Sequence, residues 1–126
     1  RTPALEGPRA MAAFVLEHCP RARWVCVTLG EEGCLALERA TDGALAATVV
    51  PAWPLPTEGA GEVRDTTGAG DAFIGAAAAG LRRGLALRDT LRLASYVAAA
   101  NCSADGARGG MPRLAQLPAE LRSLLD

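Results

Sequence analysis

The chain has 126 residues, half of them apolar and only 4% aromatic, with a formal net charge of −1. This composition is that of a globular chain, long enough for one compact domain or for part of a larger one. The arginines stand singly or in pairs such as Arg82-Arg83. That argues against nucleic acid as the main partner, because neutralising phosphates needs clustered cations. No apolar run reaches the roughly 18 residues that a membrane-spanning helix needs.

The four cysteines do not have the spacing of a metal-binding motif. Cys19, Cys26, Cys34 and Cys102 form no C-x-x-C pair, and His18 is the single histidine. A zinc site is therefore not expected. Cys26 and Cys34 lie in apolar runs and are expected to be small buried residues. Such cysteines are compatible with a reducing compartment. We expect the protein to be cytoplasmic, and an organelle stroma is also compatible.

The first predicted element is a helix over residues 8–19, with Pro8 in its first turn and Pro20 ending it. Its expected inner face carries side chains at helical spacing. These are Met11, Phe14, Val15 and His18.

A short sheet is expected next. The apolar run 24–29 predicts a strand buried on both faces, of the type found in parallel sheets. A tight turn at 30–33 leads to a second strand over 34–38, and a turn at 41–43 leads to a third over 44–50. The last two strands would form a β-hairpin.

The second half is expected to be helical. The proline-containing segment 51–61 is interpreted as an ordered surface loop in preference to a domain linker, and residues 63–64 as a brief extended piece. A glycine-rich loop over 65–70 precedes a helix over 71–83 that ends at Gly84. The remaining expected elements are a helix from Leu87 to about Ser103 with Leu91, Ala94, Val97 and Ala98 on one face, a glycine-rich loop over 105–110 and a terminal helix over 118–125.

The segment 65–73, Asp-Thr-Thr-Gly-Ala-Gly-Asp-Ala-Phe, is the most informative part of the sequence. Its small residues let the backbone approach a ligand, and the unpaired amides of the following helix form an anion site. A carboxylate at Asp71 would repel a phosphate, but it suits a base that takes the proton of a hydroxyl attacking phosphorus. The segment therefore predicts phosphoryl transfer.

Two other glycine-rich motifs fit this loop less well. A Walker A loop needs Lys-Ser or Lys-Thr after its last glycine, and a Rossmann fingerprint needs a third glycine where Phe73 stands. An ordinary helix N-terminus remains as an alternative, with Asp71 complementing the helix dipole for about 0.3–1 kcal/mol.

The segment 65–73 resembles the second signature of the ribokinase-type (PfkB) family of carbohydrate kinases. Residues 27–33 resemble the strand and turn that contact ATP in that family. Residues 98–107 and Met111-Pro112 resemble its C-terminal cation and nucleotide loops. The resemblance implies a ribokinase-like α/β fold of three layers, α/β/α, of which residues 1–126 would be the C-terminal, ATP-binding and catalytic portion.

The resemblance also implies roles for single residues. Asp71 would be the catalytic base, and the amides of Gly68, Ala69, Gly70 and Asp71 would form the anion hole. A second group would contact ATP: Thr28, Gly30, Gly33, Gly70 and Ser95. A third would ring a potassium-type cation with oxygen ligands: Asp65 and Thr67, with backbone oxygens near Asn101, Ala104, Gly106 and Gly110.

Simpler explanations stand beside these roles. Asp65 would also suit an Asx cap of its turn. Thr28, Gly30 and Gly33 would also suit ordinary hairpin chemistry, and Ser95 and Asn101 would suit polar positions of a helix.

The N-terminal half of the family, with its sugar pocket and lid strands, has no counterpart in the chain, nor has the Asn-x-x-Glu motif that supports magnesium. Because the chain also starts at Arg1 without an initiator methionine, we expect a fragment of a longer protein. The implied activity is transfer of phosphate from ATP to a sugar hydroxyl, with Mg²⁺ and K⁺, in a homodimer formed by the lid strands. A truncated nucleotide-binding or interaction module, or a nucleoside kinase of the same superfamily, are the alternatives.

Overall fold

The computed structural model describes residues 4–54, 66–102 and 112–126. It divides into two compact units, Arg1–Pro51 and Ala52–Asp126, and each is described by itself. Three predicted features lie outside the described residues: most of the loop over 51–61, the extended piece at 63–64 and the glycine-rich loop at 105–110. No helix among the described residues is long and apolar enough to span a bilayer.

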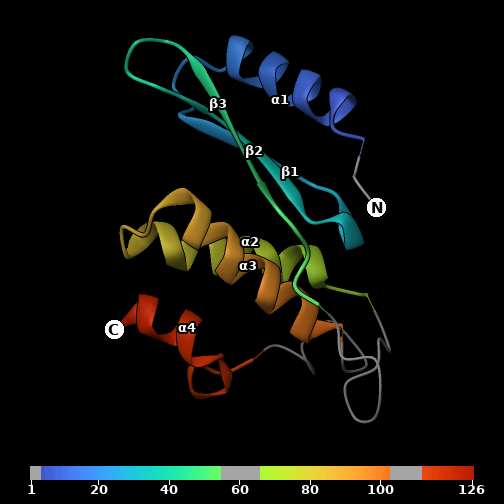
Figure 1. Cartoon of the computed structure of the whole chain (residues 1–126), viewed down its shortest axis with the longest axis vertical. Helices are drawn as coiled ribbons and strands as arrows, with labels where there is room; N and C mark the ends of the chain where they lie inside the picture. The colour runs from blue at the N-terminus through green and yellow to red at the C-terminus, as the bar shows by residue number, and fades with distance from the viewer. Residues whose placement is uncertain (1–3, 55–65, 103–111) are drawn as a thin grey trace. The chain divides into compact units, whose positions relative to one another are not determined.

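The first unit contains an antiparallel sheet of three strands in the order β1-β2-β3 (Figure 1). The strands are β1 (Trp24–Thr28), β2 (Cys34–Arg39) and β3 (Leu45–Val50). The register pairs Val25 with Leu37 and Leu37 with Ala47. The predicted hairpin of the second and third strands is confirmed, and the middle strand carries the most buried residues of the sheet.

The prediction for the first strand is wrong in the part of the chain that the structure describes. β1 is half-buried rather than buried on both faces, and it pairs with β2 in antiparallel, not parallel, orientation. A short apolar run by itself is compatible with either type of strand. Antiparallel pairing follows from the short turn, since parallel strands need a long crossover connection.

The thiols of β1 and β2 differ in burial. Cys34 is buried as predicted, whereas Cys26 is only half-buried, which corrects its expected burial. A hydrogen bond with Cys34, together with partial burial, raises the pKa of the Cys26 thiol far above its ordinary value. A thiol held protonated in this way is a poor nucleophile and a poor metal ligand.

Helix α1 (Glu6–His18) covers the sheet with a different face from the one predicted. Ala12 and Leu16 are buried and pack with Leu37. Met11 and Phe14, expected inside, are 62% and 60% exposed. The helix has apolar residues on most of its circumference, so periodicity allowed either face. Ala12 and Leu16 face the sheet instead.

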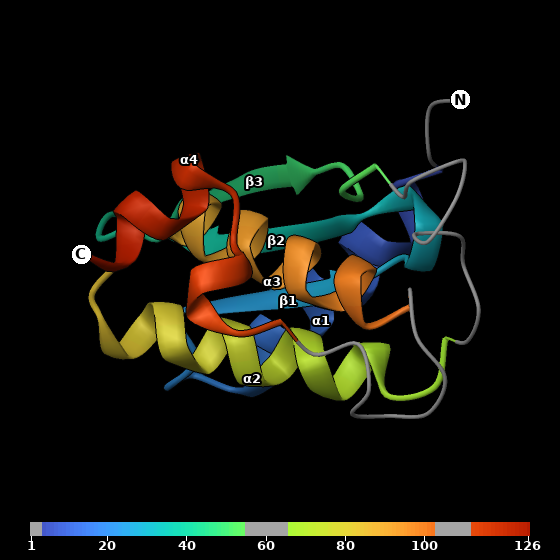
Figure 2. The same cartoon turned by 90° about the horizontal axis from the view of Figure 1, so that it is seen from below.

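The second unit is built on helices α2 (Ala69–Arg82) and α3 (Leu87–Asn101), which lie side by side (Figure 2). Both were predicted, and α2 ends at Arg82, two residues before Gly84, whose φ is 72°. The amides of Gly84 and Leu85 donate to the carbonyls of Leu81 and Gly80, which closes the helix end. The helices come very close at Gly80: a Cβ there would lie 2.9 Å from Thr90 Oγ1.

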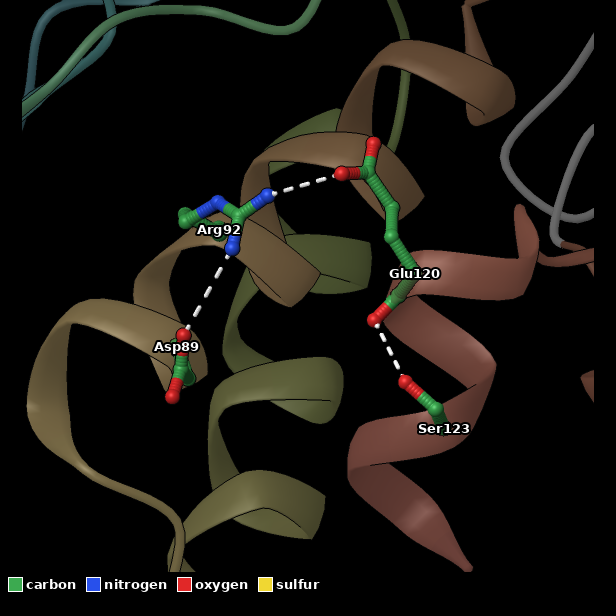
Figure 3. A network of polar contacts seen from close by, with 4 residues as sticks. All are labelled: Asp89, Arg92, Glu120 and Ser123. Carbon is green, nitrogen blue, oxygen red and sulfur yellow. Dashed lines mark hydrogen bonds and ion pairs between the residues drawn. The ribbon is translucent and has the colours of Figure 1, made fainter.

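The terminal segment packs on α3. The predicted helix over 118–125 is a short α-helix, α4 (Ala119–Arg122), continued by a 3₁₀ turn, η3 (Ser123–Leu125). Leu117 and Leu121 pack with Leu93 of α3. At the surface, Arg92 of α3 forms ion pairs with Asp89 and with Glu120 of α4 (Figure 3).

Candidate active site

The N-terminus of α2 is formed by the glycine-rich segment that the sequence singled out. Gly68 precedes the helix with φ 79° and ψ 0°, a left-handed conformation that glycine adopts without strain. No side chain caps the helix. Ser, Thr, Asp and Asn are preferred at this position because their side chains accept from the first amides. A side-chain cap is absent from α1 (Glu6–His18) and α3 as well, so the partners of the individual amides decide which of them are available.

The first amides of α2 differ in their partners. The amide of Ala69 donates to the Thr66 carbonyl at 3.2 Å, and that of Ala72 donates to the Gly68 carbonyl at 2.9 Å. Among the described residues, no group accepts from the amides of Gly70 or Asp71. Both of these residues are exposed. Two adjacent amides at a helix start, open to solvent, are a suitable site for an anion.

Asp71 occupies the first turn of α2, two residues after its start. Asp71 is exposed and belongs to the same first turn as the two amides without an acceptor. An exposed carboxylate at this point could receive a proton from a hydroxyl held in front of the amides. The predicted anion hole and base therefore lie on one turn of one helix, and their catalytic roles stay predictions.

A second contact joins this turn to the far end of α3. The Asn101 side chain is fully buried, and its Nδ2 donates to the Thr67 carbonyl at 3.0 Å. Figure 2 shows the start of α2 and the end of α3 at the same end of the helix pair. The sequence pointed to Asn101 for a backbone oxygen and missed this side-chain contact. A lone Asn after a run of three alanines was the signal available.

The other predicted cation ligands are only partly described. Thr67 is exposed, whereas Asp65, Ala104, Gly106 and Gly110 lie outside the described residues. Within the described ranges, no three His, Cys, Asp or Glu side chains gather as a metal site would require. Ser95, predicted to contact adenine, lies on α3 and is 8% exposed. That contact stays a prediction.

The predicted ATP-contacting turn lies in the first unit. Thr28 is exposed at the end of β1, and a 3₁₀ turn, η1 (Gly30–Glu32), follows it. Gly30 has φ 59° and Gly33 has φ 98° with ψ −134°. The turn is closed by its own amides, with Leu29 donating to the Gly33 carbonyl at 2.8 Å. Turn geometry thus accounts for both glycines, and their contact with ATP stays a prediction.

Comparison with known proteins defines the class to which this fold belongs. The chain aligns with solved structures of ribokinase-like kinases over most of its length, so its helices and antiparallel sheet are part of a ribokinase-like α/β fold. A family model described as pfkB family carbohydrate kinase matches residues 8–114. The chain belongs to the PfkB family of carbohydrate kinases.

Three relatives illustrate the similarity. A ribokinase of Lactococcus lactis is 46% identical over 63 residues, which are 50% of this chain and 21% of that protein. The nucleoside kinase of Burkholderia thailandensis, solved in complex with inosine, aligns with a TM-score of 0.69 and 27% identity over 91% of this chain and 37% of its own. A ribokinase of Cryptococcus neoformans var. grubii, solved in complex with ADP, aligns with a TM-score of 0.67 and 28% identity. The alignment covers 97% of this chain and 36% of that protein. The chain spans well under half of each relative.

Proposed function

We propose that the complete polypeptide containing this chain transfers the terminal phosphoryl group of ATP to a hydroxyl of a sugar. The first turn of α2 carries the proposal: the amides of Gly70 and Asp71 have no acceptor among the described residues, and the same turn holds the exposed acidic residue Asp71. Membership of the PfkB family supports the reaction class. The ADP bound by the Cryptococcus ribokinase supports the nucleotide.

The proposed step divides the work between backbone and side chain. The substrate hydroxyl oxygen attacks the terminal phosphorus, and the bond from phosphorus to the ADP oxygen breaks. The proton of the hydroxyl passes to the Asp71 carboxylate. The amides of Gly70 and Asp71 hold the phosphoryl oxygens as negative charge develops; of the other two predicted donors, Ala69 already donates to the Thr66 carbonyl, and the role of the Gly68 amide stays a prediction. Positioned acid–base help is worth about 10²- to 10⁴-fold in rate, and one oxyanion donor about 10²- to 10³-fold.

Two metal ions belong to the proposal. Mg²⁺ would reach the site with the nucleotide, since magnesium in such sites is held largely by substrate phosphates and supplies charge neutralisation there. For a monovalent cation, the Thr67 carbonyl fits in type, because a carbonyl oxygen suits a hard ion. The other oxygen ligands that the family resemblance implies stay predictions. The predicted homodimer through lid strands stays a prediction.

A nucleoside is the second candidate acceptor, because the Burkholderia relative was solved with inosine. The experiment is a panel assay on the complete polypeptide with ATP, Mg²⁺ and K⁺, in which ³¹P NMR detects phosphorylated sugars or nucleosides. Turnover of ribose, fructose or a related sugar supports the proposal, and turnover confined to nucleosides supports the second candidate. Saturable ATP binding without turnover of any acceptor would instead support a non-catalytic module.

A further inference from the structure

Burial of the Asn101 carboxamide costs free energy. Its side chain is fully buried, and only its Nδ2 has a partner, the Thr67 carbonyl. Its Oδ1 is buried with no hydrogen-bond partner among the described residues. A buried polar atom without a partner costs about 1–3 kcal/mol, while a single amide hydrogen bond returns about 0.5–1.5 kcal/mol. The residue therefore contributes little net stability. Its presence at this buried position favours a role in function over a role in folding.

The contact made by Asn101 reaches the backbone of the proposed catalytic turn. Thr67 directly precedes Gly68, whose left-handed conformation starts α2. Thr67 itself is exposed, but its carbonyl accepts a hydrogen bond from the buried side-chain amide of Asn101. Fixing this carbonyl fixes the peptide plane that enters Gly68. Gly68 leads directly into the residues that carry the two amides without an acceptor, Gly70 and Asp71.

The helix pair has other contacts that hold it together. Ala72, Phe73 and Ala77 of α2 are buried, as are Leu91 and Ala94 of α3. At the opposite end of the pair, Gly80 and Thr90 lie in close contact. Loss of the Asn101 side chain would thus leave the two helices packed and would release mainly the turn before α2.

We propose that the carboxamide of Asn101 is a positioning residue for phosphoryl transfer: by holding the Thr67 carbonyl it sets the direction of the anion-binding amides and of the Asp71 carboxylate. The inference rests on the proposed function for its effect on rate. Asn101 touches no reacting atom in this proposal. It acts through the backbone of the turn, which is a different role from the backbone oxygen that the family resemblance implies.

Two substitutions remove the Nδ2 donor in different ways. Asn101→Ala deletes the side chain, and Asn101→Asp keeps its shape while replacing the donor by an acceptor. Thr90→Ala is the matched control, because it also truncates a fully buried polar side chain of α3 whose oxygen has no partner, but at the other end of the pair. All three are made in the complete polypeptide.

Steady-state kinetics give the first readout. Small displacements of a catalytic group cost on the order of 10²-fold in rate. We expect both Asn101 variants to lower kcat by about 10- to 100-fold, with the KM for ATP changed less than about threefold. Thr90→Ala is expected to stay within about twofold of the wild type in both constants. Unchanged kcat in a folded Asn101 variant, or an equal loss in Thr90→Ala, overturns the inference.

A second readout does not depend on turnover. In ¹H–¹⁵N spectra of the wild type, the side-chain amide protons of Asn101 should exchange slowly with water, and Asn101→Ala should shift the backbone amides of residues 68–71 more than Thr90→Ala does. Rapid exchange, or no difference between the variants, refutes the positioning role even if a variant is unstable. If no acceptor is phosphorylated but these signals behave as expected, the proposed function fails while the structural link stands.

Discussion

The helices of the two units pack against their neighbours in different ways. In Arg1–Pro51, large side chains such as Leu16 and Leu37 fill the space between α1 and the sheet. In Ala52–Asp126, helices α2 and α3 approach where side chains are smallest, at Gly80. The first unit should therefore be sensitive to lost volume and the second to added volume.

The glycine turns of the two units differ in a way that bears on function. In the turn after β1, the amides of Leu29, Glu32 and Gly33 all donate to carbonyls of the same turn. At the start of α2, the amides of Gly70 and Asp71 have no acceptor among the described residues. Positive φ alone therefore does not distinguish a structural glycine from one that presents a binding site. The partners of the neighbouring amides make the distinction.

The largest effect on stability is expected in the core of the first unit. Leu37 lies on the central strand, is fully buried and packs with Ala12 and Leu16. Leu37→Ala should lower the free energy of unfolding of the full chain by about 2–5 kcal/mol, through lost burial and the cavity left behind. Equilibrium urea unfolding measures this loss. Leu45→Ala, at a site 41% exposed on β3, is the control and should change it by less than about 1 kcal/mol. Similar losses in the two variants would refute the assigned core.

A smaller loss of stability is expected in the second unit, where the cause is added volume rather than lost volume. In Gly80→Ala the new Cβ would meet Thr90 Oγ1 at 2.9 Å and Cγ2 at 3.0 Å. Overpacking costs about 1–3 kcal/mol, and the better helix propensity of alanine returns up to about 1 kcal/mol. We expect a net loss of about 1–2 kcal/mol in urea unfolding.

Two matched variants sharpen that measurement. Gly75→Ala lies in the same helix with no atom within 4 Å of the new Cβ, so it should stabilise by up to about 1 kcal/mol. In a Thr90→Ala background, the cost of Gly80→Ala should fall, because the closest atoms are gone. A stabilising Gly80→Ala in the wild-type background would show that the helices are not in close contact there.

The smallest effect is expected at the surface of α3. Arg92 lies 3.6 Å from Asp89 and 3.3 Å from Glu120, and its side chain is 35% exposed. Exposed ion pairs contribute about 0–1 kcal/mol and weaken with salt. Arg92→Ala should therefore lower stability by about 1 kcal/mol or less, and the difference should shrink in 1 M NaCl. A loss above about 2 kcal/mol would indicate that this network is a main support of α4.

The sequence predicted the strongly patterned elements well. The three strands, both long helices and the glycine-rich start of α2 follow from turn residues and periodicity, and the structure has them within a few residues. The environment of each face was harder to predict. The face of α1 with Met11 and Phe14 is apolar but exposed, and the first strand is antiparallel and half-buried. Local patterns do not say which neighbour covers a face.

In the candidate site, too, the local feature was predicted from the sequence and the tertiary contact was not. The segment around Gly68 and Asp71 was found from residue types, because small residues before a helix define an anion site without any tertiary information. The hydrogen bond from Asn101 to Thr67 joins residues 34 positions apart in the sequence. Its prediction needs the packing of α3 against α2, which no local pattern carries.

The most direct test of the account compares two acidic residues in equivalent places. Asp71 is in the first turn of α2 and Asp89 in the first turn of α3, so both complement a helix dipole. Only Asp71 is proposed to accept the substrate proton. The measurement is kcat of the complete polypeptide carrying Asp71→Asn or Asp89→Asn, with the acceptor found in the panel assay. The account predicts a loss of about 10²- to 10⁴-fold for Asp71→Asn and less than about threefold for Asp89→Asn. Near wild-type kcat in Asp71→Asn, or equal losses in both variants, would contradict it.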